Sequence, residues 1–94
     1  MIIGVATIEL RLPGNGSLKG KRRVVKSIVA RLHNEYNVSV AEVEAQDVWQ
    51  RAVIGIACVS SSAEYAHSLL TKAIRTVERW RLDAEVVDYD IELI

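Results

Sequence analysis

One stretch decides the fold: residues 2–32, which read IIGVATIELRLPGNGSLKGKRRVVKSIVARL. Its first part, residues 2–12, alternates apolar and polar positions, as a strand with one buried face does. After the Pro13–Gly16 turn the hydrophobic period lengthens to about 3.6 residues, which is typical of an amphipathic helix. The stretch therefore predicts a strand followed by a helix over residues 18–35, with Ser17 as its N-cap.

Two β-rich segments follow, over residues 37–46 and 49–60. The short link between them predicts an antiparallel hairpin. The second segment keeps a regular alternation, but the first changes its parity in the middle. We therefore expect a β-bulge near Ala41.

A second helix and a last strand complete the chain. Ser61 and Glu64 have the spacing of a capping box and mark the start of the helix. Its core stripe is predicted to contain Ala66, Leu69, Leu70, Ala73, Ile74, Val77 and Trp80. In the last strand, residues 84–94, the buried face is predicted to carry Val87, Tyr89, Ile91 and Leu93, with Asp88, Asp90 and Glu92 on the opposite face.

The resulting order, β-α-β-β-α-β, predicts an α+β ferredoxin-like sandwich with a four-stranded antiparallel sheet and two helices on one face. The length of 94 residues allows one domain, residues 1–94, with a single modest core. This fold supports many unrelated functions, so function has to come from individual residues.

Several functional classes find little support. The apolar opening segment ends at Glu9, too early for a membrane span or a typical signal peptide. A lone Cys58, predicted to be buried and inert, favours a reducing compartment, and we expect a cytoplasmic protein. His33 and His67 are not spaced like the ligands of a metal site. The sequence also shows no acid, base and nucleophile that would come together in a catalytic site. We therefore expect no enzymatic activity, no cofactor and no metal.

Charge is unevenly distributed although twelve basic and twelve acidic residues cancel over the whole chain. Residues 17–36 carry six cations against Glu35 alone, a net charge of +5. Residues 37–94 carry five basic and ten acidic residues, a net charge of −5. Several of the cations fall in the first turns of the predicted first helix, where the helix dipole already places positive charge. An external anion would compensate this unfavourable arrangement.

The predicted anion-binding or nucleic-acid-binding residues at this helix start are Ser17, Lys19, Lys21, Arg22, Arg23 and Lys26. Lys19, Arg23 and Lys26 recur every three to four residues and form a stripe, which suits a row of phosphates. The alternative interpretation is a solvated helix face. Base stacking on the sheet is disfavoured, because the chain has no Phe and its last strand is acidic.

The hairpin turn supplies a second candidate surface, for a protein partner or second subunit: Asp47, Trp49, Gln50 and Arg51. An exposed Trp among polar residues anchors many interfaces. The competing interpretation, which we favour, is that Trp49 covers the end of the core, since Trp is usually largely buried.

Several motifs resemble those of the YlxP-like proteins, the domain-of-unknown-function family 503. They are Ser17–Arg23 (SLKGKRR), Asn37–Val43 (NVSVAEV), Gln46–Gln50 (QDVWQ) and Gly55–Ala57 (GIA). The resemblance covers essentially the whole chain and implies a small bacterial ferredoxin-like protein. Genes of this family often lie between those for translation initiation factor two and ribosome-binding factor A, which implies a link to translation or ribosome assembly without an established activity. Gly20 and Ala45 depart from the family, which usually has an acidic residue and often a His at these positions.

Two functions compete on these grounds. The first is an RNA-associated accessory protein, bound to ribosomal RNA or a ribosomal subunit through the first helix. The second is an ACT-like amino-acid sensor with its ligand at the 13–18 turn, and the basic stripe favours the first. A protein-interaction module acting through the sheet face is a further alternative. We also expect a homodimer, because the open sheet face presents Ile3, Val5, Val53 and Ala57.

Overall fold

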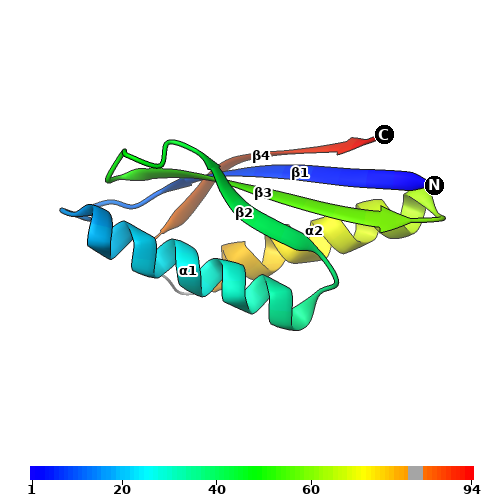
Figure 1. Cartoon of the computed structure of the whole chain (residues 1–94), viewed down its shortest axis with the longest axis horizontal. Helices are drawn as coiled ribbons and strands as arrows, with labels where there is room; N and C mark the ends of the chain where they lie inside the picture. Colours follow the sequence, from blue (N-terminus) through cyan, green and yellow to red (C-terminus); the bar gives the residue numbers. More distant parts are fainter. Residues whose placement is uncertain (81–83) are drawn as a thin grey trace.

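The computed structural model describes residues 1–80 and 84–94 (Figure 1). Its elements are β1 (Ile2–Arg11), α1 (Leu18–Glu35), β2 (Ser39–Glu44), β3 (Arg51–Ser60), α2 (Ala63–Arg79) and β4 (Glu85–Leu93). The predicted element order is confirmed, and the bounds of α1 agree with the predicted helix.

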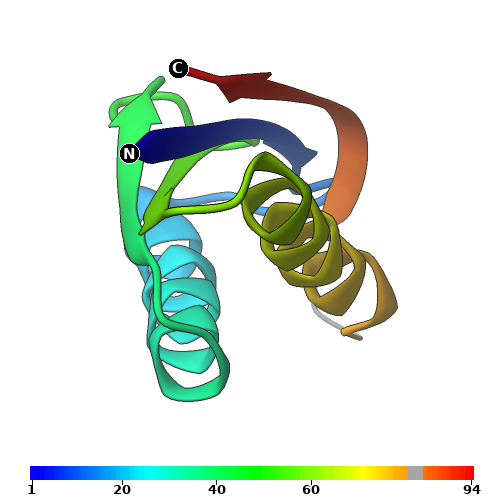
Figure 2. The ribbon, with the colours of Figure 1, turned by 90° about the vertical axis from the view of Figure 1, so that its right-hand side faces the viewer.

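The four strands form one antiparallel sheet in the order β2-β3-β1-β4. Both helices lie on the same face of this sheet (Figure 2). This arrangement confirms the predicted ferredoxin-like α+β fold. It leaves the other sheet face open and places β2 and β4 at the edges.

The core lies between the sheet and the helices, and it follows the predicted hydrophobic periods. The buried core residues are Ala6, Ile8, Leu10, Leu12, Val25, Ile28, Leu32, Ala52, Ile54, Ile56, Cys58, Ala66, Leu70, Ala73, Ile74 and Val77. The helices also contact each other through polar groups: the Tyr36 Oη lies 2.6 Å from the Thr76 Oγ1. The Arg31 guanidinium lies 4.7 Å from the Trp80 ring centroid and is paired with Glu35 at 2.9 Å.

The predicted position of the bulge in β2 is wrong by two residues. The register with β3 shifts between Glu42 and Glu44, so the extra residue is Val43 rather than Ala41. Val40 and Glu42 therefore share the face that looks toward the helices, opposite Ile56 and Ile54.

A second bulge corrects the predicted faces of β4. Val86 pairs with Leu10 and Asp88 with Glu9, so Val87 is the extra residue between them. Val86 takes the core side instead of Val87, which is exposed. Ile91 packs against the core, whereas Tyr89 and Leu93 are exposed at the sheet edge. The three acidic residues lie on the open face as predicted, because their β1 partners are Val5, Thr7 and Glu9.

The N-cap of α2 also lies one residue later than predicted. The Ser62 hydroxyl, not that of Ser61, accepts from the Tyr65 N–H at 3.2 Å. The Ser60 hydroxyl accepts from the Ser62 N–H at 3.0 Å, which fixes the backbone just before the cap. In a run of three serines the side-chain pattern alone does not select the cap.

The open sheet face is partly apolar. Ile3, Val5 and Ala57 are half-buried, and Val53 is buried beneath its neighbours on this face. Val59 beside them is 67% exposed. Within the described residues, no helix is both long and apolar enough to cross a membrane.

The homodimer stays a prediction, and this face provides its test. We expect sedimentation equilibrium at high protein concentration to give about twice the mass of the 10.5 kDa chain. Val59→Lys, which places a charge on the apolar part of the face, should shift the equilibrium toward monomer. A mass of 10.5 kDa at every concentration would contradict the prediction.

Candidate functional site

The first turn of α1 begins with a side-chain cap and has no acidic residue to offset the helix dipole. The Ser17 hydroxyl accepts a hydrogen bond from the Gly20 N–H at 3.0 Å, which confirms Ser17 as the N-cap. Its oxygen therefore satisfies a backbone donor of the helix itself.

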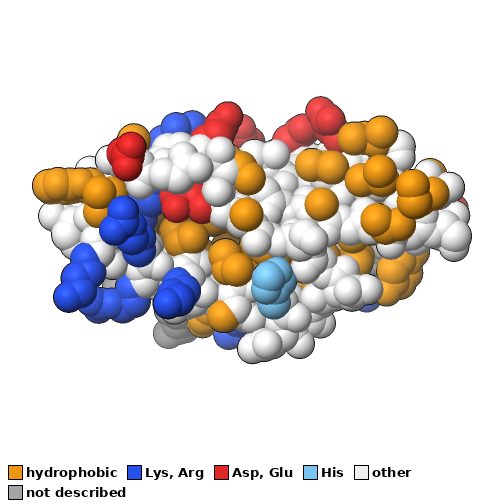
Figure 3. Space-filling model, in the orientation of Figure 1, with side chains coloured by type: hydrophobic (Ala, Val, Ile, Leu, Met, Phe, Trp, Pro, Cys, Tyr) orange, Lys and Arg blue, Asp and Glu red, His pale blue; other side chains and the backbone are white. Residues whose placement is uncertain are grey.

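Four of the predicted cations, Lys19, Arg22, Arg23 and Lys26, occupy one exposed side of α1. Successive residues turn by about 100° around a helix, so positions 19, 22, 23 and 26 share one face. Among residues 1–80 and 84–94 these four cations make no ion pair. Lys and Arg side chains gather at the end of the molecule where α1 begins (Figure 3). The structure thus brings together a basic surface that we define by these four residues.

Lys21 does not belong to this surface, and its assignment as an anion-binding residue is wrong. Its side chain is fully buried. The Nζ atom donates to the backbone carbonyl oxygens of Ala45, of Val48 at 2.8 Å and of Arg51 at 3.0 Å. All three hydrogens of the ammonium group are therefore used inside the protein.

Glu42 supplies the charge that compensates the buried ammonium group. Its Oε2 lies 2.8 Å from the Lys21 Nζ and has no hydrogen-bond donor among the described residues. Its side chain is only 16% exposed, because Glu42 shares the helix side of β2 with Val40 and lies opposite the buried Ile54. The ion pair therefore joins α1 to the inner face of an edge strand.

Sequence reasoning missed this ion pair, although a signal was present. Lys21 lies four residues before Val25 and seven before Ile28, so it continues the core stripe of α1. Glu42 lies two residues after Val40, so its side chain is on the same, helix-facing side of β2. A cation and an anion on two buried faces of adjacent elements predict an internal pair.

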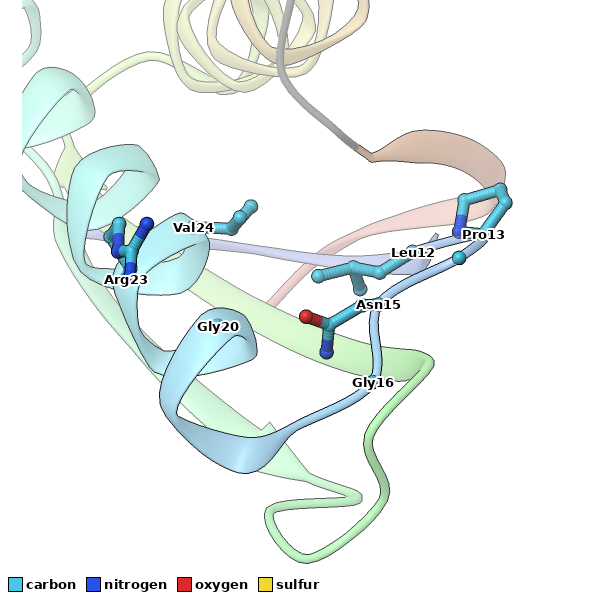
Figure 4. Close-up of a pocket in the computed structure, with 8 residues that line it drawn as sticks. Leu12, Pro13, Asn15, Gly16, Gly20, Arg23 and Val24 are labelled. Carbon is cyan, nitrogen blue, oxygen red and sulfur yellow. The ribbon is translucent and has the colours of Figure 1, made fainter.

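The loop before α1 is bound to the turn between β2 and β3. The Asn15 side-chain amide donates both to the Ser17 carbonyl at 2.8 Å and to the Trp49 carbonyl at 2.6 Å. The Gln50 side-chain amide donates to the Asn15 carbonyl at 3.2 Å, and the Leu12 N–H donates to the Gln50 carbonyl at 3.0 Å. Figure 4 shows Asn15 directed toward the helix start at Gly20.

The predicted interface residues of this turn, Asp47, Trp49, Gln50 and Arg51, are all exposed. The favoured interpretation that Trp49 covers the core end is wrong, because Trp49 is 51% exposed. The backbone carbonyls of Val48 and Arg51 accept from Lys21 and that of Trp49 accepts from Asn15, whereas the Trp49 side chain is exposed to solvent. The Arg51 guanidinium is offset by Glu9, 3.4 Å from its Nε.

A cleft of about 260 Å³ separates the loop from the helix start. Its lining includes Leu12, Pro13, Asn15, Arg23 and Val24 (Figure 4). Gly20 also lines it, and a Cβ at this position would come within 2.4 Å of the Asn15 Oδ1. The absence of a side chain at Gly20 is therefore what lets Asn15 lie against the helix.

The remaining chemistry-bearing residues are dispersed. Cys58 is buried in the core as predicted, and His33 and His67 are exposed on different helices. Within the described part of the chain, no three His, Cys, Asp or Glu side chains are grouped so as to hold a metal ion. The basic surface and the adjacent turn are consequently the strongest candidate site.

Comparison with known proteins supports the family resemblance. Residues 3–91 match the family model described as protein of unknown function (DUF503). The chain is 42% identical over 77 residues to the uncharacterized protein YlxP of Bacillus subtilis (strain 168). That alignment covers 82% of this chain and 84% of the Bacillus protein.

Removal of the buried Lys21 ammonium group should lower the free energy of unfolding. Lys21→Met leaves Glu42 without its counter-ion and three carbonyls without their donor, and we expect a loss of about 3–5 kcal/mol in unfolding free energy. Urea denaturation measures this loss. Lys21→Met/Glu42→Leu should lose less than Lys21→Met alone, because no buried carboxylate remains. A Lys21→Met protein as stable as the wild type would contradict the role assigned to this residue.

Gly20 and Asn15 should be energetically coupled. In an ordinary helix Gly→Ala stabilises by about 0.5–1 kcal/mol. Here Gly20→Ala has to displace an Asn15 side chain held by two hydrogen bonds, so we expect no gain. In the Asn15→Ala background, Gly20→Ala should stabilise the protein as it does in an ordinary helix. A double-mutant cycle in urea tests this coupling, and additive effects would refute it.

Proposed function

The chain belongs to the DUF503 family, and we propose that it is a non-enzymatic RNA-binding accessory factor. The basic surface at the start of α1 contacts the phosphates. The partner class is structured RNA, with ribosomal RNA in a ribosomal subunit as the first candidate. The link to translation that the family resemblance implies agrees with this choice.

The observation that carries the proposal is the set of four exposed cations without an ion pair among the described residues. The N-terminal end of a helix carries about half an elementary positive charge, which makes added cations there unfavourable. No acidic residue in the first turn offsets it. A polyanion would turn this unfavourable cluster into attractive contacts and release counter-ions.

The distribution of acidic residues restricts how an RNA can approach. Asp88, Asp90 and Glu92 lie on the open sheet face, opposite the face covered by the helices. Their charge repels phosphates from the surface that RNA-recognition domains of this topology use for base stacking. The proposed contact is therefore made by α1 and not by the sheet.

The cleft before α1 favours one alternative function. Its position at the 13–18 turn is the one expected for the ligand of an ACT-like amino-acid sensor, and Arg23 on its wall suits a carboxylate. A sensor site does not account for Lys19, Arg22 and Lys26, which are absent from that lining. Isothermal titration with the free amino acids tests this alternative.

A salt series tests the RNA proposal. Binding of the protein to a structured RNA and to ribosomal subunits should weaken steeply with salt, with a log–log slope of about −3 or steeper. Lys19→Glu/Arg23→Glu/Lys26→Glu should abolish this binding. The variant should remain folded, because all three side chains are exposed and make no ion pair among the described residues.

A matched control changes the charge equally on the other helix. Lys72→Glu/Arg75→Glu/Arg79→Glu reverses three exposed cations of α2 at the same spacings, and it should keep most of the affinity. Equal losses in the two triple variants would show a net-charge effect and no α1 site. Absence of binding by the wild-type protein would refute the proposed function.

A further inference from the structure

Trp49 stands out at the end of the molecule that carries the basic surface. Its side chain is 51% exposed, and its neighbour Val48 is 46% exposed. The other tryptophan, Trp80, is half-buried under Arg31. The exposed indole offers a partner a large apolar ring face together with an N–H donor.

The backbone beneath Trp49 is firmly held although its side chain is free. The Trp49 carbonyl accepts from the Asn15 amide at 2.6 Å. The Val48 and Arg51 carbonyls on either side accept from the buried Lys21. These bonds tie the turn to the loop and helix that carry the cations. The turn that bears the indole is therefore pre-organised at the end of the molecule where α1 begins, which reduces the backbone entropy lost on binding.

The charges around the turn indicate which part of a nucleic acid would contact the indole. The exposed Asp47 carboxylate, two residues away, disfavours a phosphate at the tip of the turn. The phosphate-attracting groups lie on α1 instead. A strand with its phosphates along α1 can direct a base toward the turn, and an aromatic side chain stacks on any base face.

We propose that Trp49 stacks on an unpaired base of an RNA whose phosphates lie on the basic surface of α1. This inference rests on the proposed function and specifies its substrate class. The preferred RNA is single-stranded or contains an unpaired loop or bulge. Bases inside a continuous duplex are already stacked and do not reach a side chain. A protein partner at Trp49 is the competing occupant, and the test separates the two.

The test compares a short oligoadenylate single strand with a blunt RNA duplex of the same length, at one salt concentration. The wild-type protein should bind the single strand more tightly than it binds the duplex. Trp49→Ala should weaken single-strand binding about 5- to 150-fold and leave duplex binding unchanged. Trp49→Phe should restore part of the lost affinity, because the phenyl ring still stacks.

Fluorescence gives a direct readout of the stacking. In a Trp80→Phe background, where Trp49 is the remaining tryptophan, the single strand should quench the emission and the duplex should not. Trp49→Ala should unfold at the same urea concentration as the wild type, because the bonds from Lys21 and Asn15 go to backbone atoms.

The outcomes separate this inference from the proposed function. Equal binding of both RNAs, unchanged in Trp49→Ala, would overturn the stacking inference and leave the phosphate contact intact; the indole would then serve a protein partner or none. Failure of the wild-type protein to bind either RNA would overturn both. Loss of duplex binding in Trp49→Ala would also overturn the assignment of Trp49 to an unpaired base.

Discussion

The Lys21 ammonium group, buried among three carbonyls and one carboxylate, is the contact on which this end of the molecule depends. Removal of a charge from water costs several kcal/mol, and only nearly complete coordination offsets that cost. The carbonyls of Ala45, Val48 and Arg51, which all face Lys21, come from the segment that joins β2 to β3 and from the first residue of β3. β2 ends at Glu44 and β3 begins at Arg51, so this segment is longer than the predicted link between the two strands.

The same residue type has opposite roles on two sides of α1. Lys21 faces the sheet and orders the turn, whereas Lys19 and Lys26 face solvent beside it. The inward cation places the indole-bearing turn, and the outward cations give the neighbouring surface its charge. One helix therefore carries an electrostatic surface and also holds the turn that bears the exposed Trp49. The unfavourable interaction of the outward cations with the helix dipole is tolerated because packing stabilises the helix.

The hydrophobic periods and the turn residues of the sequence were sufficient to predict the element order, the bounds of α1 and the buried face of β1. The errors in strand faces fell where one residue interrupts a period: Val43 in β2 and Val87 in β4 each shift the register. Such bulges depend on tertiary contacts, which a single strand does not reveal. In the candidate site the exposed cations followed from spacing. The burial of Lys21 and the exposure of Trp49 did not, because residue-type averages place lysine outside and tryptophan inside.

The burial of Lys21 also has a consequence for chemical labelling. An amine reacts with acylating or reductive-methylation reagents only as the free base and only when the reagent reaches it. A reagent does not reach the Nζ of Lys21 while the side chain is fully buried beneath the turn that supplies its three carbonyls. Lys19 and Lys26, within two turns on the same helix, are open to the same reagents. The chain thus contains a protected lysine and two internal references, so the labelling ratio reports how often the turn detaches from α1 in the native protein.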